Sequence, residues 1–387
     1  MSTTAVICEY NPLHSGHEYH ISTLKQSCDD AVIAIMSDDF VQRAEPAIFS
    51  KHVRAEAAVN AGCDLVLELP APYSFGSAEY FARAGVYIAD AIGVCDKLSF
   101  GSESGDIGEL IKLSECIAGD EFTGRVADIL EKDKTLGYMQ ARSLAACELY
   151  GDAASNIITS PNNILGLEYI KSAKALESKL KLETLKRRGD GYNDLGGSGE
   201  YVSASFLREC IYNCRDTKEF VPKECSEVYK NTKYASFDKC QAAVLSFFRL
   251  NKPENLSDYA EISDGLEYRL CRCAWEARTL SELFLLAATK KYTNARLRRA
   301  ILSCMLGVYE VDFKALPGYT RVLAANSRGR ELLKQMKKTS AIEIVTNGRP
   351  ETDDEISRRV QGLYSLCFDE NVSPFDLISE SPYIDKK

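Results

Sequence analysis

Short apolar runs that alternate with helix-like stretches restrict the possible folds of this sequence more than any other feature. The runs are typical of buried strands, because apolar residues fill them and turn residues or polar residues bound them. They cover residues 4–10, 30–37, 64–70, 96–100 and 181–187. Strands separated by helices in this way form a parallel sheet with helices on both faces. The sequence therefore predicts an α/β fold with a Rossmann-like parallel sheet.

The pattern changes after about residue 220, where strand signals end and helical periodicity dominates. In residues 294–306, apolar side chains recur with the spacing of one helix face, and three arginines lie off that face. We therefore predict two units. Residues 1–220 form the α/β unit, with a helical insertion at about 105–155, and residues 221–387 form an α-helical unit.

Charge is distributed unevenly along the chain. The whole chain has 47 Lys and Arg against 56 Asp and Glu, a net charge of −9. Residues 1–200 hold 18 basic and 30 acidic residues, a net of −12, so the remainder carries +3. Residues 285–340 hold twelve basic and three acidic residues. Such a stretch is usually a solvated helix face, but interleaved Tyr292, Tyr309 and Tyr319 also suit RNA, by stacking on unpaired bases.

Several classes of protein are not expected from this composition. No apolar run approaches the roughly 18 residues of a membrane span, and the start MSTTAVICEY lacks the basic and apolar regions of a secretory signal. The fourteen cysteines include no C-x-x-C pair, and no histidine lies beyond residue 52 to complete a zinc set. We expect a cytoplasmic protein with reduced, mostly packed cysteines and no metal ligands.

All four histidines, His14, His17, His20 and His52, lie near the start of the chain. Three of them follow the first predicted strand, where an open parallel sheet binds its ligands. The next helix offers backbone N–H groups and the positive end of its dipole, and Gly16 allows close backbone approach. His14 and His17 could both donate to one phosphate and stabilise its developing charge. A metal site is the alternative, and without cysteines or carboxylates at a known spacing we rank it lower.

Residues 7–20, ICEYNPLHSGHEYH, resemble the H-x-G-H motif of the nucleotidyltransferase superfamily, whose members attack the α-phosphate of a nucleotide and release pyrophosphate. More narrowly, the chain resembles the bacterial tRNA(Met) cytidine acetate ligase family. The matching pieces occur in order as EYNPLHSGH (9–17), FVQRAEPAIFSK (40–51), DLVLELP (64–70), FGSE (100–103), SPNNILGLEY (160–169), KRRGDGYND (186–194), SASFLR (203–208), KYTNARLRRAIL (291–302) and RGRELLKQMKK (328–338).

The resemblance implies a reaction in which acetate and ATP give acetyl-adenylate, with release of pyrophosphate. The acetyl group then passes to the N4 amine of the wobble cytidine in elongator tRNA(Met), and AMP is released. It further implies that residues 1–220 are a nucleotidyltransferase-like catalytic domain that binds ATP, with Mg²⁺ bridging the phosphates. Residues 221–387 would hold the anticodon arm. No protein partner and no membrane are implied.

The site residues are predicted from the motif and the resemblance together. His14 and His17 are the expected catalytic residues. Those expected to bind ATP are Ile7, Cys8, Glu9, Tyr10, Asn11, Pro12, Leu13, His14, Ser15, Gly16, His17, Glu18, Tyr19, His20, Gly101, Asn162, Asn163, Arg187, Arg188, Ser203, Ser205 and Arg208. Those expected to bind tRNA are Lys290, Lys291, Arg296, Arg298 and Arg299. Ser203 or Ser205 could equally cap a helix, and the arginines could be solvated.

The sequence also departs from the family pattern. Asp38-Asp39 replaces a Gly-Asn pair after the second strand and adds negative charge near the expected phosphate site. These carboxylates could bind Mg²⁺ or could point to solvent. Two other functions stay open: a nucleotidyltransferase that acts on a small phosphorylated substrate, which leaves the basic region unexplained, and a non-catalytic tRNA-binding protein, which leaves His14, His17 and Arg208 unexplained.

Overall fold

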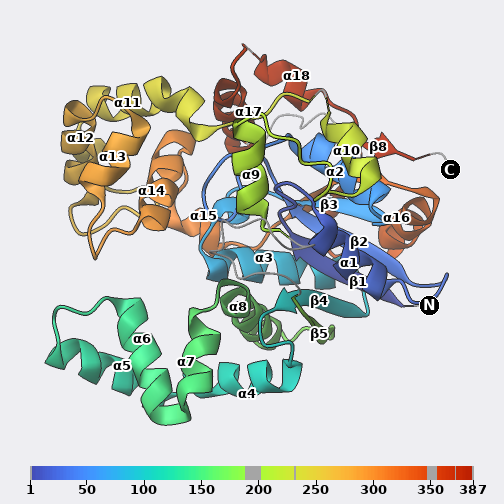
Figure 1. The fold of residues 1–387 in the computed structure, drawn as a ribbon, viewed down its shortest axis with the longest axis horizontal. Coiled ribbons are helices and arrows are strands. Elements are labelled where there is room, and N and C mark those ends of the chain that lie inside the picture. The colour runs from blue at the N-terminus through green and yellow to red at the C-terminus, as the bar shows by residue number, and fades with distance from the viewer. Residues whose placement is uncertain (1, 188–201, 231, 347–354, 371, 386–387) are drawn as a thin grey trace.

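The computed structural model describes residues 2–187, 202–230, 232–346, 355–370 and 372–385 (Figure 1). Its centre is an eight-stranded sheet in the order β5-β4-β1-β2-β3-β6-β7, with β8 beside β6. The strands are β1 (Thr3–Cys8), β2 (Ala31–Ser37), β3 (Leu65–Leu69), β4 (Lys97–Ser102), β5 (Lys181–Lys186), β6 (Tyr319–Ala325), β7 (Glu343–Val345) and β8 (Tyr383–Ile384).

Helices cover both faces of this sheet and form two further lobes. The helices are α1 (Ser15–Leu24), α2 (Lys51–Asn60), α3 (Ala78–Ala91), α4 (Ile107–Ile117), α5 (Asp120–Lys132), α6 (Tyr138–Tyr150), α7 (Asp152–Thr159), α8 (Pro161–Ala175), α9 (Ala204–Tyr212), α10 (Lys223–Tyr229), α11 (Gln241–Leu250), α12 (Leu266–Glu276), α13 (Leu280–Ala287), α14 (Asn294–Leu306), α15 (Glu310–Lys314), α16 (Ser327–Thr339), α17 (Glu355–Tyr364) and α18 (Pro374–Ile378).

The five predicted strands are all present and all run parallel. β1 pairs with β2 and β4, β2 pairs with β3, and β4 pairs with β5. Every residue of β2 and β3 is buried, as expected of strands covered by helices on both faces. The predicted helical insertion at about 105–155 corresponds to α4–α7. The prediction of a mixed α/β fold built on a parallel sheet is confirmed.

The prediction that strands end before residue 220 is wrong. β6 lies antiparallel to β3, with Leu65 opposite Ala325, and it carries β7 and β8 beside it. Its sequence, YTRVLAA, gives only a weak strand signal because Arg321 interrupts the apolar run. In the fold Arg321 is buried, and its guanidinium forms an ion pair with the Glu68 carboxylate of β3 at 3.2 Å. Part of the expected helical unit therefore completes the central sheet, and the two-unit division stays a prediction.

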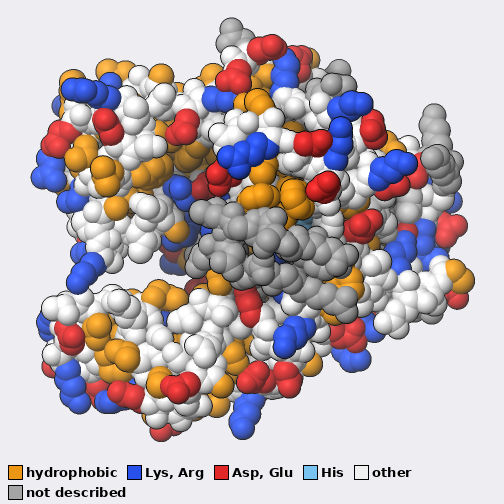
Figure 2. Space-filling view, viewed as in Figure 1, with side chains coloured by type: hydrophobic (Ala, Val, Ile, Leu, Met, Phe, Trp, Pro, Cys, Tyr) orange, Lys and Arg blue, Asp and Glu red, His pale blue; other side chains and the backbone are white. Residues whose placement is uncertain are grey.

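Two helical lobes extend from the same side of the sheet (Figure 1). One contains α5, α6 and α7, and the other contains α11–α14. A notch open to solvent separates the lobes in the space-filling view (Figure 2). They meet where Lys290 Nζ donates a hydrogen bond to the backbone oxygen of Thr135 at 3.0 Å. Within the described residues, no helix is long and apolar enough to cross a membrane.

Candidate active site

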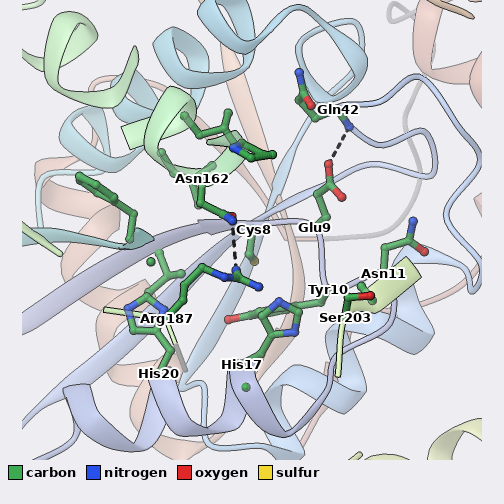
Figure 3. Close-up of a pocket in the computed structure, with 18 of the residues that line it drawn as sticks. Cys8, Glu9, Tyr10, Asn11, His17, His20, Gln42, Asn162, Arg187 and Ser203 are labelled. Atoms are coloured by element: carbon green, nitrogen blue, oxygen red, sulfur yellow. Dashed lines mark hydrogen bonds between the residues drawn. The ribbon is translucent and has the colours of Figure 1, made fainter. Parts of the chain in front are cut away.

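A cavity of about 500 Å³ lies at the carboxyl ends of β1, β4 and β5, between the first turns of α1, α8 and α9. We call it the central cavity (Figure 3). The predicted site residues that line it are Ile7, Cys8, Glu9, Tyr10, Asn11, His14, Gly16, His17, Tyr19, His20, Gly101, Asn162, Arg187, Ser203, Ser205 and Arg208. Segments nearly 200 residues apart thus meet at the edge of the sheet where a Rossmann-like fold binds its ligand.

His14 and His17 stack on each other at one wall of the cavity, with ring centroids 3.8 Å apart. His14 is the N-cap of α1, and its Nδ1 accepts a hydrogen bond from Gly16 N at 3.1 Å. His17 Nδ1 accepts from His14 N at 3.3 Å. A nitrogen that accepts carries no proton, so in each neutral ring the proton lies on Nε2. Both histidines therefore offer an N–H donor.

Burial keeps these rings neutral. Desolvation, followed by repulsion from Arg187, lowers the pKa of His14 to about 3. Desolvation and the neighbouring His14 lower the pKa of His17 well below its usual value. The pKa of His20 falls to about 4 for the same reasons as that of His14, and its Nε2 lies 2.8 Å from Ser99 Oγ. At neutral pH the site presents uncharged imidazoles, which donate without adding a positive charge.

The first turn of α1 differs from what its sequence predicts. We expected its backbone N–H groups to be free for a phosphate. Instead, Ser15 N donates to Phe220 O at 3.0 Å, and Gly16 N donates to the His14 ring. His17 N and Glu18 N both donate to His14 O. The anion-binding capacity of this motif therefore resides in the histidine side chains and not in the helix amides.

α9 forms a second donor-rich wall. Ser203 is its N-cap, and Ser203 Oγ accepts from Phe206 N at 3.2 Å, so the capping alternative for Ser203 is confirmed. The Arg208 guanidinium donates to Asn11 O at 2.8 Å and to Ser205 Oγ at 3.1 Å. These bonds fix a cation over the first turn of α9, whose positive dipole end also faces the cavity.

The β4 wall is organised by Glu103. Its carboxylate accepts from the backbone N–H groups of Asn162 and Asn163 at 3.2 and 2.8 Å and caps α8. Asn163 Oδ1 in turn accepts from the backbone N–H groups of Glu103 and Ser104. Asn162 Oδ1 accepts from Arg187 Nη1 at 3.3 Å and faces the cavity (Figure 3). Asn162 thus lies where a ligand can reach it, whereas buried Asn163 shapes the loop and does not line the cavity.

Comparison with known proteins finds relatives of one family along nearly the whole chain. A family model described as HIGH Nucleotidyl Transferase matches residues 1–376. A tRNA(Met) cytidine acetate ligase of Clostridium perfringens is 36% identical over 95% of this chain and 95% of its own. One from Thermoanaerobacter sp. is 35% identical over 89% of this chain and 88% of its own. The chain belongs to the tRNA(Met) cytidine acetate ligase family.

Solved structures agree with this membership. Thermotoga maritima TmcAL bound with alpha-thio ATP has a TM-score of 0.87 to this chain, with 29% identity and 99% coverage of both chains. The apo form of that protein has a TM-score of 0.89 with 28% identity. This chain therefore shares its overall fold with that protein.

Some predicted residues of this ligase family member lie outside the cavity lining. They are Pro12, Leu13, Ser15, Glu18 and Asn163, while Arg188 lies outside the described residues. The sequence analysis in turn missed lining residues on elements that carry no recognisable motif. They include Gln42, Phe81, Phe100, Leu165, Tyr169 and Lys186. Most of these are apolar or aromatic residues within strands and helices, and only their position in the fold distinguishes them from ordinary core residues.

Asp38 and Asp39, the departure from the family pattern, fit neither of the alternatives we considered. Both are buried and neither lines the central cavity. Lys51 Nζ lies 2.9 Å from Asp38 Oδ1 and 2.5 Å from Glu68 Oε1. Gln361 Nε2 donates to Asp39 Oδ2 at 2.9 Å. The two carboxylates therefore link α2 to α17, and Lys51 in turn joins them to Glu68 of β3. Among the described residues no group of three His, Cys, Asp or Glu could hold a metal.

The predicted tRNA-binding arginines of α14 have acidic or backbone partners. Arg298 lies 2.7 Å from Glu45 and Arg299 lies 2.6 Å from Glu261. The Arg296 guanidinium lies 3.9 Å from Asp264 and donates to Ser263 Oγ at 2.6 Å. Lys291 also pairs with Asp264, at 3.2 Å. A polyanion would have to exchange with these partners, and the assignment of the five basic residues to tRNA stays a prediction.

The expectation that Tyr292 stacks on an unpaired base is wrong. Its side chain is buried, and its hydroxyl donates to Asp264 O at 2.5 Å. Tyr309 is exposed and packs against Tyr259. Tyr292 therefore belongs to the core of the helical lobe, and RNA stacking by Tyr309 and Tyr319 stays a prediction.

Proposed function

We propose that this chain ligates acetate to the N4 amine of the wobble cytidine of elongator tRNA(Met), at the expense of ATP and through an acetyl-adenylate. The observation that carries the proposal is the central cavity, which is lined by two neutral histidine donors, by Arg208 and by the serine-capped start of α9. The choice of substrates rests on the names of the relatives, which are tRNA(Met) cytidine acetate ligases.

The first step is attack by an acetate oxygen on the α-phosphorus of ATP. An O–P bond forms, the bond to the β-phosphate bridge breaks, and pyrophosphate leaves. The Nε2–H groups of His14 and His17 would donate to the α-phosphate oxygens as charge builds on them. Arg208 and the start of α9 would bind the leaving pyrophosphate. Such a displacement needs positioning and charge stabilisation more than covalent help.

Mg²⁺ would enter with the phosphates of ATP. Glu9 is the only Asp or Glu among the described residues that line the cavity, so these residues offer no carboxylate set for a resident Mg²⁺. The ion would neutralise charge on the phosphates, while the histidines and arginines orient them.

The second step is attack of the cytidine amine on the acetyl carbonyl. The lobe that contains α11–α14 would hold the anticodon arm through Lys290, Lys291, Arg296, Arg298 and Arg299. Phosphate contacts of this kind position an RNA without reading its sequence. The notch between the two lobes (Figure 2) gives an RNA strand access to this side of the molecule.

Acetate-dependent exchange of labelled pyrophosphate into ATP tests the first step in the absence of tRNA. Mass spectrometry of tRNA incubated with the protein, ATP and acetate tests the second step. We expect exchange only with acetate present, and a mass increase of one acetyl group at a cytidine. Exchange with a phosphorylated alcohol in place of acetate would favour the other nucleotidyltransferase, and tRNA binding with no exchange at all would favour the non-catalytic protein.

A further inference from the structure

Glu9 stands apart in the central cavity because it is the only acid among the described lining residues. It directly follows β1, and its side chain extends toward Gln42 on the side of the cavity opposite His20 and Arg187 (Figure 3). A carboxylate in a pocket that must hold a triphosphate is electrostatically costly. Its presence there calls for a chemical role that a donor cannot fill.

The position of Glu9 is fixed from two directions. Gln42 N donates to its Oε1 at 3.0 Å (Figure 3). Arg54, which is fully buried, donates to its backbone oxygen at 2.6 Å and also to the backbone oxygens of Ser37 and Asp38. Within the described part of the chain, Glu9 Oε2 has no hydrogen-bond donor. One oxygen is therefore anchored and the other is available to a ligand.

The other titratable side chains of the cavity are poorly suited to accept a proton. His14 and His17 already use Nδ1 as an acceptor, so their Nε2 atoms carry the protons that face the ligand. His20 Nε2 is engaged with Ser99 Oγ. Lysine and arginine side chains are donors only. His20 is a weak base, because burial and Arg187 lower its pKa to about 4. Burial raises the pKa values of Cys8, Tyr10 and Tyr169 and keeps them protonated. Among the described acidic and histidine residues of the lining, Glu9 is therefore the best proton acceptor.

The proposed second step needs such an acceptor. The lone pair of the cytosine N4 amine is delocalised into the ring, so the amine is a weak nucleophile. When it attacks the acetyl carbonyl, the nitrogen becomes positively charged and must lose a proton before the product is stable. A positioned base typically contributes about 10²- to 10⁴-fold to such a step. Acidic side chains also accept from cytosine N4 in nucleic-acid recognition.

We propose that Glu9 Oε2 accepts a hydrogen bond from the cytidine N4 amine and takes its proton during acetyl transfer. This inference rests on the proposed function. The N4–C bond forms and the C–O bond to the adenylate breaks. AMP leaves with that electron pair, one N4 proton passes to Glu9, and Glu9 later releases it to water.

The electrostatics of the site suit this role. Burial raises the pKa of Glu9 and makes its carboxylate a stronger base, while Arg208, Arg43 and Arg54 act in the opposite direction and favour the ionised form. Gln42 N also favours the ionised form, because it donates to Oε1. A base is more effective in proton transfer when its pKa lies closer to the operating pH.

The test separates the two half-reactions in the full-length protein. Glu9→Gln keeps an acceptor for Gln42 N but cannot take a proton. Because Glu9 also lines the nucleotide cavity, the test compares the two half-reactions. We expect single-turnover acetyl transfer from synthetic acetyl-adenylate to the tRNA transcript to slow by about 10²-fold or more, and to slow at least about tenfold more than acetate-dependent pyrophosphate exchange. The wild-type transfer rate should rise with pH to a plateau, and the Gln variant should lose that rise. Glu9→Asp should recover part of the transfer rate and the pH dependence.

Glu227→Gln is the matched control, because Glu227 is an exposed acid of α10 outside the cavity. It should leave both assays unchanged. Transfer by Glu9→Gln at the wild-type rate would overturn the proposal, and so would an equal loss of exchange and transfer in that variant with an unchanged melting temperature. Absence of acetate-dependent exchange in the wild type would instead overturn the proposed function and, with it, this role for Glu9.

Discussion

The wall that contains His14 and His17 and the outer face of α14 both carry donors suited to phosphate, but they are built differently. The two histidines are largely enclosed, neutral, and oriented by backbone hydrogen bonds. Arg298 and Arg299 lie on a partly exposed face, where Glu45 and Glu261 pair with them. Enclosed donors need no reorganisation when a transition state forms, whereas a surface arginine must leave one anion to bind another.

The largest expected effect is the loss of pyrophosphate exchange when one of the two enclosed histidines is replaced. His14→Ala and His17→Ala should each slow acetate-dependent pyrophosphate exchange by roughly 10²- to 10³-fold, the usual cost of one preorganised donor. Because His14 also caps α1, its Ala variant should lose about 1 kcal/mol of stability. His14→Asn restores a capping side chain and should recover the melting temperature without recovering exchange. Wild-type exchange rates in both alanine variants would contradict the catalytic assignment.

For the exposed arginines of α14 we expect a smaller effect, which is limited to tRNA affinity. Reversing Arg296, Arg298 and Arg299 to Glu should weaken tRNA binding by about 10²-fold at 0.1 M salt, if each contact contributes about 0.7 to the salt slope. Pyrophosphate exchange should be unchanged. Glu45→Gln is the matched control, because it releases Arg298 from its partner and should leave tRNA affinity equal or higher. Loss of exchange in the triple variant, with the fold intact, would assign these arginines to the nucleotide site.

A salt series compares the exposed basic face with the enclosed cavity without any mutation. If four to six of the basic residues in 285–340 contact phosphate, log affinity for tRNA against log salt should have a slope of about −3 to −4. ATP binding should depend much less on salt, because it rests on directed hydrogen bonds in an enclosed site. Filter binding of tRNA and of ATP over one salt series gives both slopes. A flat tRNA curve would remove the electrostatic case for the basic region.

The smallest expected effect is on pH dependence. Since the pKa of His14 is about 3 and that of His20 about 4, neither should produce a titration near pH 6.5 in the exchange rate. These folded-state pKa values lie below those of the unfolded chain, so the unfolded chain binds more protons as pH falls. Stability should therefore decrease from about pH 6.5 downward. His14→Asn should show a shallower decrease in thermal unfolding, and an unchanged decrease would mean that His14 titrates normally.

The same contrast explains which parts of the molecule could be predicted from sequence. The parallel strands follow from apolar runs, and the H-x-G-H residues follow from a motif next to the first of them. The ends of β4, β5 and α9 then reach the same cavity because the carboxyl ends of parallel strands share one edge. Pairing between α14 and distant acids such as Glu45 has no local signal, because those partners are set by tertiary packing.

β6 escaped prediction for a related reason. A buried arginine within a strand is recognisable only with its partner, and the partner of Arg321 is Glu68, some 250 positions earlier. The Asp38-Asp39 pair was equally ambiguous in sequence, since its cations, Lys51 and Arg54, come from the next helix. The partners of such buried charges come from distant parts of the chain, so their role follows only from the fold.

The pairing of β6 with β3 has a consequence for how the chain is made. β3 is complete once residue 69 has left the ribosome, but its outer edge stays unpaired until Tyr319–Ala325 arrives. During that interval a nascent chain or a truncated fragment exposes the unpaired edge of an apolar strand, Leu65–Leu69, which can pair with a strand of another chain. A catalytic fragment that ends near residue 220 should therefore aggregate, and the native sheet forms only when the two distant parts of the polypeptide are both available.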